Sequence, residues 1–264
     1  MASGAHRAGT ANVVEVFSSI QGEGPWVGTR TLFVRFGECD LRCAWCDSPG
    51  TWRPAEEARI EQAPGGAWQV EKNPLAIDRI VAACQELDLA AHRFVALTGG
   101  EPLLQPEAVA ALAGALAGRG PRLYLETHGL AESALARVID AIDVVSMDWK
   151  LASDVRRESD PRSGPVADFH DAHERFLRTA HAGAETYVKA VITPASRDEE
   201  LLEMAARIAR VDPALPVVLQ PVTPIGRVRE RPGAARMLSL ASLLAQTLRD
   251  VRVIPQTHPV WQAR

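Results

Sequence analysis

The feature that most constrains the fold is the alternation of short apolar runs with longer helical patterns along the 264 residues of the chain. The apolar runs have the length of β-strands and lie at 30–36, 93–97, 122–126, 144–147, 186–192, 217–220 and 251–254. The helical patterns lie at 75–87, 106–117, 131–141, 167–182, 198–211 and 234–248. Such alternation is typical of βαβ units and predicts a parallel sheet, in a full barrel, a partial barrel or an open doubly wound sheet. In each case the carboxyl ends of the strands carry the site.

Residues 12–18 alternate apolar and polar side chains and lead into a glycine-rich turn at 20–25, which predicts an edge strand entering a functional loop. Asn73 and Pro74 predict a helix N-cap followed by proline at the first helical position. Segments rich in proline and polar residues predict loops or insertions at 49–74, 153–165 and 221–233. We expect a disordered leader over 1–11 and one domain over 12–264.

Charge and hydropathy exclude several functional classes. The formal net charge of -4, without a dense run of Lys and Arg, argues against general nucleic-acid binding. No stretch of apolar residues is long enough to predict a membrane span. The small, polar residues 1–11 do not resemble a secretory signal, so we expect a cytoplasmic protein.

Three cysteines lie close together in the pattern C-x3-C-x2-C: Cys39, Cys43 and Cys46. Thiolate sulfur is the soft ligand that iron–sulfur clusters require, so the pattern predicts a [4Fe–4S] cluster. Three protein ligands leave one iron open for the amine and carboxylate of S-adenosylmethionine (SAM). Cys84 lies within a helical pattern and is expected in the core.

Two other classes compete with this interpretation. A zinc site usually has a fourth Cys or His at ordered spacing, and none lies nearby in the sequence. A simple iron–sulfur electron carrier normally has four cysteines and does not need a chain of this length.

A second motif, Thr98 to Pro102, follows an apolar run and reads Thr-Gly-Gly-Glu-Pro. Gly99 and Gly100 at a strand end allow a ligand to lie against the backbone. Glu101 is a candidate to receive the ammonium group of SAM.

The two motifs together resemble the radical SAM superfamily. The flanking segments 17–28, 33–36 and 46–48, and the tail at 251–258, are similar to the 7-carboxy-7-deazaguanine synthase family. The resemblance extends over roughly residues 12–258.

The resemblance implies a partial (shortened), TIM-like radical SAM barrel of α/β class with parallel strands. It implies a lyase that contracts 6-carboxy-5,6,7,8-tetrahydropterin to 7-carboxy-7-deazaguanine with loss of ammonia, in queuosine or deazapurine biosynthesis. The implied cofactors are the [4Fe–4S] cluster, SAM and Mg²⁺. The implied partners are an external electron donor, such as flavodoxin or ferredoxin, and a second copy of the chain.

Residue roles follow where the motifs match. The cluster ligands are Cys39, Cys43 and Cys46, and the Mg²⁺ ligand is Ser48. The SAM contacts are Gly99, Gly100, Glu101, Ser146, Lys150 and Gln220. The pterin contacts are Ile20, Gln21, Gly22, Glu23, Arg35, Thr98 and His258. Thr127 and His128 end a strand near these positions but have no assigned role.

Two departures from the family pattern stand out. Glu38 precedes Cys39 where a small residue is expected. The irregular segment 49–74 replaces a first barrel helix, which bears on where the electron donor binds. Another radical SAM enzyme, such as a glycyl-radical activating enzyme, shares C-x3-C-x2-C but has no need of the 20–25 turn or Ser48.

Overall fold

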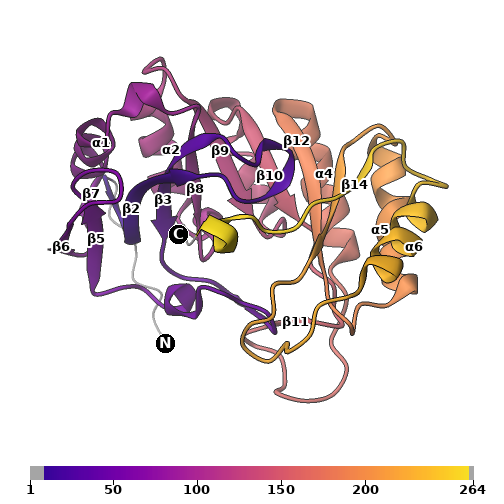
Figure 1. Cartoon of the computed structure of the whole chain (residues 1–264). Helices are drawn as coiled ribbons and strands as arrows, with labels where there is room; N and C mark the ends of the chain where they lie inside the picture. Colours follow the sequence, from indigo (N-terminus) through magenta and orange to yellow (C-terminus); the bar gives the residue numbers. More distant parts are fainter. Residues whose placement is uncertain (1–8, 262–264) are drawn as a thin grey trace.

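The computed structural model describes residues 9–261, and a ten-stranded sheet forms its centre (Figure 1). The strands lie across the sheet in the order β14 (Val251–Val253), β13 (Val217–Pro221), β12 (Glu185–Ile192), β10 (Val144–Asp148), β9 (Arg122–Thr127), β8 (Phe94–Gly99), β3 (Arg30–Phe36), β2 (Val13–Ile20), β5 (Glu57–Glu61) and β6 (Trp68–Lys72). The strands from β14 to β3 run parallel. The outermost strands, β14 and β6, do not pair with each other, so the sheet is an open, partial barrel, as predicted.

Helices connect the parallel strands and pack on one another along one face of the sheet. They are α1 (Ile77–Glu86), α2 (Pro106–Leu116), α3 (Glu132–Leu135), α4 (His170–Gly183), α5 (Asp198–Val211) and α6 (Ala234–Leu244). In Figure 1, α1 lies beside the end of the sheet that carries β5, and α5 and α6 lie beside β14. Short 3-10 helices occur at Gly24–Trp26, Pro49–Trp52, Leu89–Ala91, Pro102–Leu104, Ile139–Ala141 and His258–Trp261.

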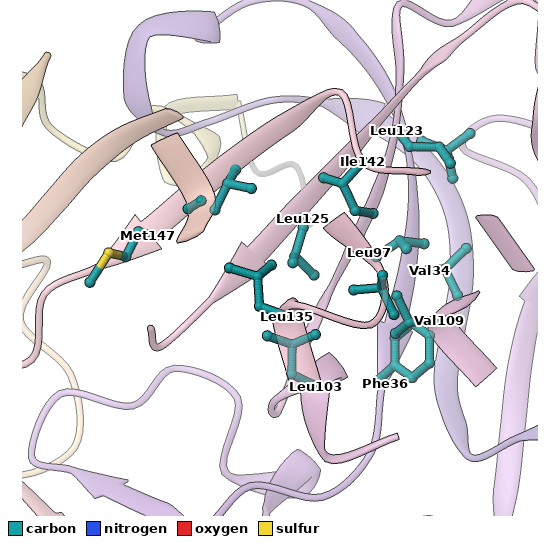
Figure 2. Packing of buried hydrophobic residues seen from close by; sticks show 14 of the residues in the cluster. Val34, Phe36, Leu97, Leu103, Val109, Leu123, Leu125, Leu135, Ile142 and Met147 are labelled. Carbon is teal, nitrogen blue, oxygen red and sulfur yellow. The ribbon is translucent and has the colours of Figure 1, made fainter. Parts of the chain in front are cut away.

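Alternation along the strands gives the sheet two different faces, because successive side chains of a strand point to opposite sides. Aliphatic side chains such as Val34, Leu97 and Leu125 belong to the large core that also contains the buried helix residues (Figure 2). The opposite face carries a separate cluster that is rich in aromatic rings: Phe17, Phe33, Phe94, Ala96, Tyr124, Val144, Tyr187 and Val218. We call the face that carries this cluster the inner face. The cluster fills one end of it, and different side chains lie at the other end, where the strands have their carboxyl ends.

The predicted edge position of 12–18 is wrong. The segment is strand β2, which pairs with β3 on one side and β5 on the other. Part of 49–74, predicted to be irregular, forms the β5–β6 hairpin. In β5, Ala58 and Ile60 point into the core, while Arg59 on the other face lies over the ring of Trp68, 4.6 Å from its centroid.

Three further expectations need correction. The predicted loop 153–165 contains β11 (Val155–Arg157), which pairs with β4 (Leu41–Cys43) in the cysteine segment. The predicted helix 131–141 consists only of α3 and a separate 3-10 turn. Asn73 does not cap α1, whose N-cap is Ala76. The Asn73 side chain instead bonds both the backbone N–H and the carbonyl of Val13.

The expected leader is partly outside the described residues, because the structure describes nothing before residue 9. Its last residues, Thr10–Ala11, form strand β1. This strand pairs with β7 (Leu75–Ala76), so these two residues belong to a regular element. No helix within the described 9–261 is both long and apolar enough to span a membrane.

Candidate active site

The inner face of the sheet changes from aromatic to polar as the strands approach their carboxyl ends. Three aromatic residues of the cluster are each followed, two residues later on the same strand, by a charged residue. The pairs are Phe33 and Arg35, Tyr124 and Glu126, and Tyr187 and Lys189. Because side chains two apart share a face, these polar groups point into the space above the aromatic cluster. The polar residues that line the cavity from strands β3 to β13 are Arg35, Thr98, Glu126, Thr127, Asp148, Lys189 and Gln220.

The cysteine segment forms one wall of this cavity. Cys39, Cys43 and Cys46 are half-buried free thiols that all line it. Pairing of β4 with β11 places Cys43 opposite Val155, and the N–H of Ala44 donates to Asp154 O at 2.9 Å. The segment is thus held by backbone bonds, leaving the three sulfurs available.

The chemistry of the three thiols fits a metal cluster. Burial raises the pKa of Cys39 to about 12 and that of Cys43 to about 11, and it also raises the pKa of Cys46. Buried thiols of this kind become thiolates when they coordinate a metal, whose charge replaces the lost proton. Within residues 9–261, no three His, Cys, Asp or Glu side chains are grouped to hold a single metal ion.

The Gly-Gly-Glu motif is packed directly against the residue before the cysteines. The Glu101 N–H donates to Glu38 O at 2.7 Å, and a Cβ on Gly100 would lie 1.9 Å from that same carbonyl oxygen. Glycine at position 100 therefore allows an approach between two backbones that a side chain would prevent. Glu38 itself has a φ of 73°, an uncommon conformation for a residue with a side chain.

Glu101, expected to contact the ammonium group of SAM, is set back from the cavity that the other expected SAM contacts near it line. Its side chain is fully buried and accepts bonds from Leu103 N at 3.0 Å, Thr127 Oγ1 at 2.8 Å and His128 N at 2.8 Å. Both carboxylate oxygens are thus occupied by groups of the chain. Glu101 joins the end of β8 to the end of β9, where Thr127 and His128 do reach the cavity.

Ser146 also lies outside the cavity, although its strand leads into it. Ser146 is buried beside Tyr124 and Tyr187, whose hydroxyls bond each other below the cavity floor. The next inward residue of β10 is Asp148, which does line the cavity. All other residues predicted for the cluster, SAM, Mg²⁺ and pterin line this cavity, from Ile20 to His258.

The loop after β2 forms the wall opposite the cysteines. Gln21 donates through Nε2 to Glu126 Oε1 at 2.8 Å, and Thr98 donates to the other oxygen of Glu126 at 2.6 Å. Burial raises the pKa of Glu126, and the neighbouring carboxylate of Glu23 raises it further. The loop and strand ends therefore present amide, carboxyl and hydroxyl groups side by side.

The carboxyl-terminal segment closes over the same loop. Thr257 N donates to Gly22 O at 2.9 Å, and Gln256 Nε2 donates to Glu23 Oε1 at 2.6 Å. His258 packs so closely on Gly22 that a Cβ there would lie 2.7 Å from His258 Nδ1. The loop after β2 and the segment 256–258 therefore meet at the cavity.

A chain of buried charges joins the two walls. Glu23 pairs with Lys189, Lys189 Nζ lies 3.0 Å from Asp148 Oδ1, and Lys150 Nζ lies 2.7 Å from Asp148 Oδ2. Lys150 also lies over the ring of Trp45, 4.7 Å from its centroid, beside Cys46. Burial opposes the charge on Asp148, but the two lysines prevail and lower its pKa.

The remaining predicted contacts have separate surroundings. Arg35 lines the cavity, and its Nε bonds Glu15 Oε1 at 2.9 Å. Ser48 Oγ donates to Asp47 Oδ1 at 2.9 Å at the cavity mouth. Gln220 Oε1 is buried and has no hydrogen-bond partner, so it fits a donor from a bound ligand. Cavities of about 190, 320 and 220 Å³ adjoin here, a size suited to small-molecule ligands.

The sequence interpretation missed several polar groups in the cavity: Glu126, Asp148, Lys189 and Gln256. A signal existed for the first three. Each is a charged residue in or at the end of an otherwise apolar strand, where burial of a charge without a partner is costly. Gln256 lies beyond the last strand and had no such signal.

Comparison with known proteins agrees with this site. The family described as the radical SAM superfamily matches residues 34–208. A 7-carboxy-7-deazaguanine synthase of Geobacter sulfurreducens is 37% identical over 254 residues, which cover 94% of this chain and 96% of that protein. A protein of the same name from Methanopyrus kandleri is 36% identical over 255 residues, covering 94% and 92%.

Solved structures show the same fold at lower identity. QueE from Escherichia coli superposes with a TM-score of 0.61 at 21% identity, covering 94% of this chain and 95% of that one. A radical SAM methyltransferase from Sphaerobacter thermophilus gives a TM-score of 0.55 at 17% identity, covering 86% and 66%. With the three cysteines at the strand ends and these relatives over most of its length, the chain belongs to the 7-carboxy-7-deazaguanine synthase family of the radical SAM superfamily.

Proposed function

We propose that this enzyme converts 6-carboxy-5,6,7,8-tetrahydropterin to 7-carboxy-7-deazaguanine with loss of ammonia. The observation that carries the proposal is the single cavity that combines a cysteine wall with a wall of pterin-matching groups. Full-length similarity to proteins named 7-carboxy-7-deazaguanine synthase supports it.

The cysteine wall would hold a [4Fe–4S] cluster through Cys39, Cys43 and Cys46. When bound, the cluster and SAM would supply the radical chemistry: reduction of SAM gives a carbon radical that removes a hydrogen atom from the substrate. Gly99, Gly100, Lys150 and Gln220 line the adjoining space and would hold SAM. Lys150 offers an ammonium to a carboxylate, and Gln220 Oε1 offers a free acceptor to an amino group. Glu101 supports this wall from behind.

The opposite wall would hold the pterin. Glu23 and Gln21 accept and donate at neighbouring positions, which suits the amino and ring N–H groups of a pterin edge. Arg35 offers a planar fork to the substrate carboxylate. Ile20, Gly22, Thr98 and His258 complete the enclosure.

Several finer assignments belong to the same proposal. Ser48 would ligate Mg²⁺ at the cavity mouth, with Asp47 beside it; hydroxyl and carboxylate oxygens suit this hard cation. An external reductant such as flavodoxin or ferredoxin would supply the electron. The enzyme would act in the cytoplasm as a homodimer.

The test is an anaerobic reconstitution of the cluster, followed by addition of SAM, reductant, Mg²⁺ and 6-carboxytetrahydropterin. We expect mass spectrometry to detect 7-carboxy-7-deazaguanine with the wild-type protein and not with Cys43→Ala. Formation of 5′-deoxyadenosine without that product would keep radical SAM chemistry and reject the pterin as substrate.

A further inference from the structure

We propose that Lys189 is a positioning residue that holds Glu23 ionised and oriented toward the substrate. The proposal rests on the proposed function, in which Glu23 contacts the pterin. Lys189 has no role in the sequence interpretation, and its side chain lies beneath the loop that carries Glu23.

The contacts fix Lys189 from two sides. Its side chain is 8% exposed, and its Nζ bonds Glu23 Oε2 and lies 3.0 Å from Asp148 Oδ1. Register explains the second contact, because Asp148 of β10 lies directly opposite Lys189 of β12. The lysine is therefore placed by two strands of the rigid sheet, while Glu23 lies on a loop.

Glu23 depends on that lysine. Burial alone would raise the pKa of Glu23, but the charge and hydrogen bond of Lys189, together with the hydrogen bond from Gln256, outweigh burial and lower it. Gln256 donates to the other oxygen, Oε1, so the two partners hold the carboxylate in one orientation. An N–H donor of the substrate therefore meets the Glu23 carboxylate already in its bonding orientation. A carboxylate that does not have to reorient bonds its substrate more selectively.

The other groups around Glu23 would not replace Lys189. Asp148 from β10 is acidic and raises the pKa of Glu23, and Glu126 from β9 is a second carboxyl group near it. Tyr187 from β12 lies beneath Gly24, and His258 packs on Gly22. Lys189 is thus the cation in direct contact with Glu23 among the residues that the structure describes.

The experiment compares reconstituted wild-type enzyme with Lys189→Met and Lys189→Arg at pH 6, 7 and 8, measuring kcat and KM for 6-carboxytetrahydropterin. Without the lysine, buried Glu23 takes up a proton as the pH falls. We expect KM of Lys189→Met to rise by at least about tenfold from pH 8 to pH 6, since each pH unit below a pKa lowers the ionised fraction tenfold. Wild type and Lys189→Arg should show no comparable rise.

Two comparisons keep the result specific. Lys189→Gln provides a second neutral variant if Lys189→Met fails to fold or to bind iron. In Glu23→Gln/Lys189→Met the carboxyl is absent, so the pH dependence of KM should disappear although the affinity stays weak. A uniform loss of activity in Lys189→Met at all pH values, with KM unchanged, would overturn the inference. Absence of product from the wild-type enzyme would instead reject the proposed function.

Discussion

Single residues reach the cavity according to their position on an alternating strand. Arg35, Thr98 and Gln220 could be chosen from the sequence because they matched family motifs at strand ends. Ser146 lies one inward position below the cavity, and Asp148 two residues later lines it. Glu101 is set back from the cavity because it accepts bonds from Leu103 N in the next turn of its own chain segment and from Thr127 and His128 at the end of β9. Sequence spacing cannot show the two contacts from β9.

Gly100 tests how tightly the two motifs are joined. In Gly100→Ala the added Cβ would lie 1.9 Å from Glu38 O and 2.9 Å from Thr51 O, both backbone atoms that cannot rotate away. We expect displacement of the residue before Cys39, a loss of iron after reconstitution, and a fall in unfolding free energy of about 1–3 kcal/mol from overpacking. Iron analysis and denaturant unfolding measure both effects.

Gly114 provides the matched control for that substitution. It lies in α2, and a Cβ added there would have no neighbouring atom within 4 Å. Gly114→Ala should keep full iron content and raise the unfolding free energy by about 0.5–1 kcal/mol, because alanine is the better helix former. Full iron content in Gly100→Ala would show that the close approach is dispensable.

Whole elements followed from the sequence where apolar periodicity was clear. The strands β3, β8, β9 and β10 lie at or near their predicted ranges because each is a short run of residues buried on both faces of the sheet. Helix α5 (Asp198–Val211) lies at its predicted range because it buries one regular apolar face. β11 was missed because its partner β4 is distant in sequence and two of its three residues are arginines. Its pairing depends on backbone bonds that no local pattern records. The β5–β6 hairpin did carry a local signal, because β5 alternates charged residues with the buried side chains of Ala58 and Ile60.

Helices α4 and α5 are joined by a cluster of charges centred on Glu174. Its carboxylate contacts Arg178, Arg207 and Arg210, and a hydrogen bond from Arg210 is the largest cause that lowers its pKa to about 2. We expect Glu174→Gln to lower the unfolding free energy at pH 7 by about 1 kcal/mol or less, because solvent screens surface ion pairs.

The sign of the pH dependence follows from the lowered pKa. The contribution of Glu174 is fully present above the unfolded value of 4.5 and is lost as the pH falls toward 2. Urea unfolding at pH 7, 5 and 3.5 measures the free energy of unfolding of wild type and Glu174→Gln. The difference between the two should be the same at pH 7 and 5 and smaller at pH 3.5. Glu199→Gln, at an exposed position of α5, is the control; a difference that grows on acidification would contradict the assignment.

At the scale of the whole molecule, the cavity is completed by segments that are far apart in the chain. Gly22 and Thr257 are 235 residues apart and meet by a backbone bond of 2.9 Å. The cysteine wall, in contrast, comes from Cys39 to Cys46 and the ends of strands close to it in the sheet. The two walls therefore depend on different parts of the chain.

Removal of residues 256–264 tests this division. The truncated enzyme loses the partner of Glu23 Oε1 and the cover over Gly22, while the contacts of the cysteine segment stay intact. We expect it to bind iron and SAM normally, and to raise KM for the pterin at least about tenfold through the lost hydrogen bonds and enclosure. Iron analysis, SAM titration and steady-state kinetics separate the two walls; a parallel loss of iron would refute their independence.

The contact between Gly22 and Thr257 also sets an order of assembly during synthesis. A ribosome releases the cysteine segment long before Gln256 and His258, so the wall that would carry the metal cluster emerges before the segment that covers Gly22. A nascent chain can therefore present its thiols to a cluster donor while the opposite side is still open, and the substrate chamber is closed only after residues 256–258 have been synthesised.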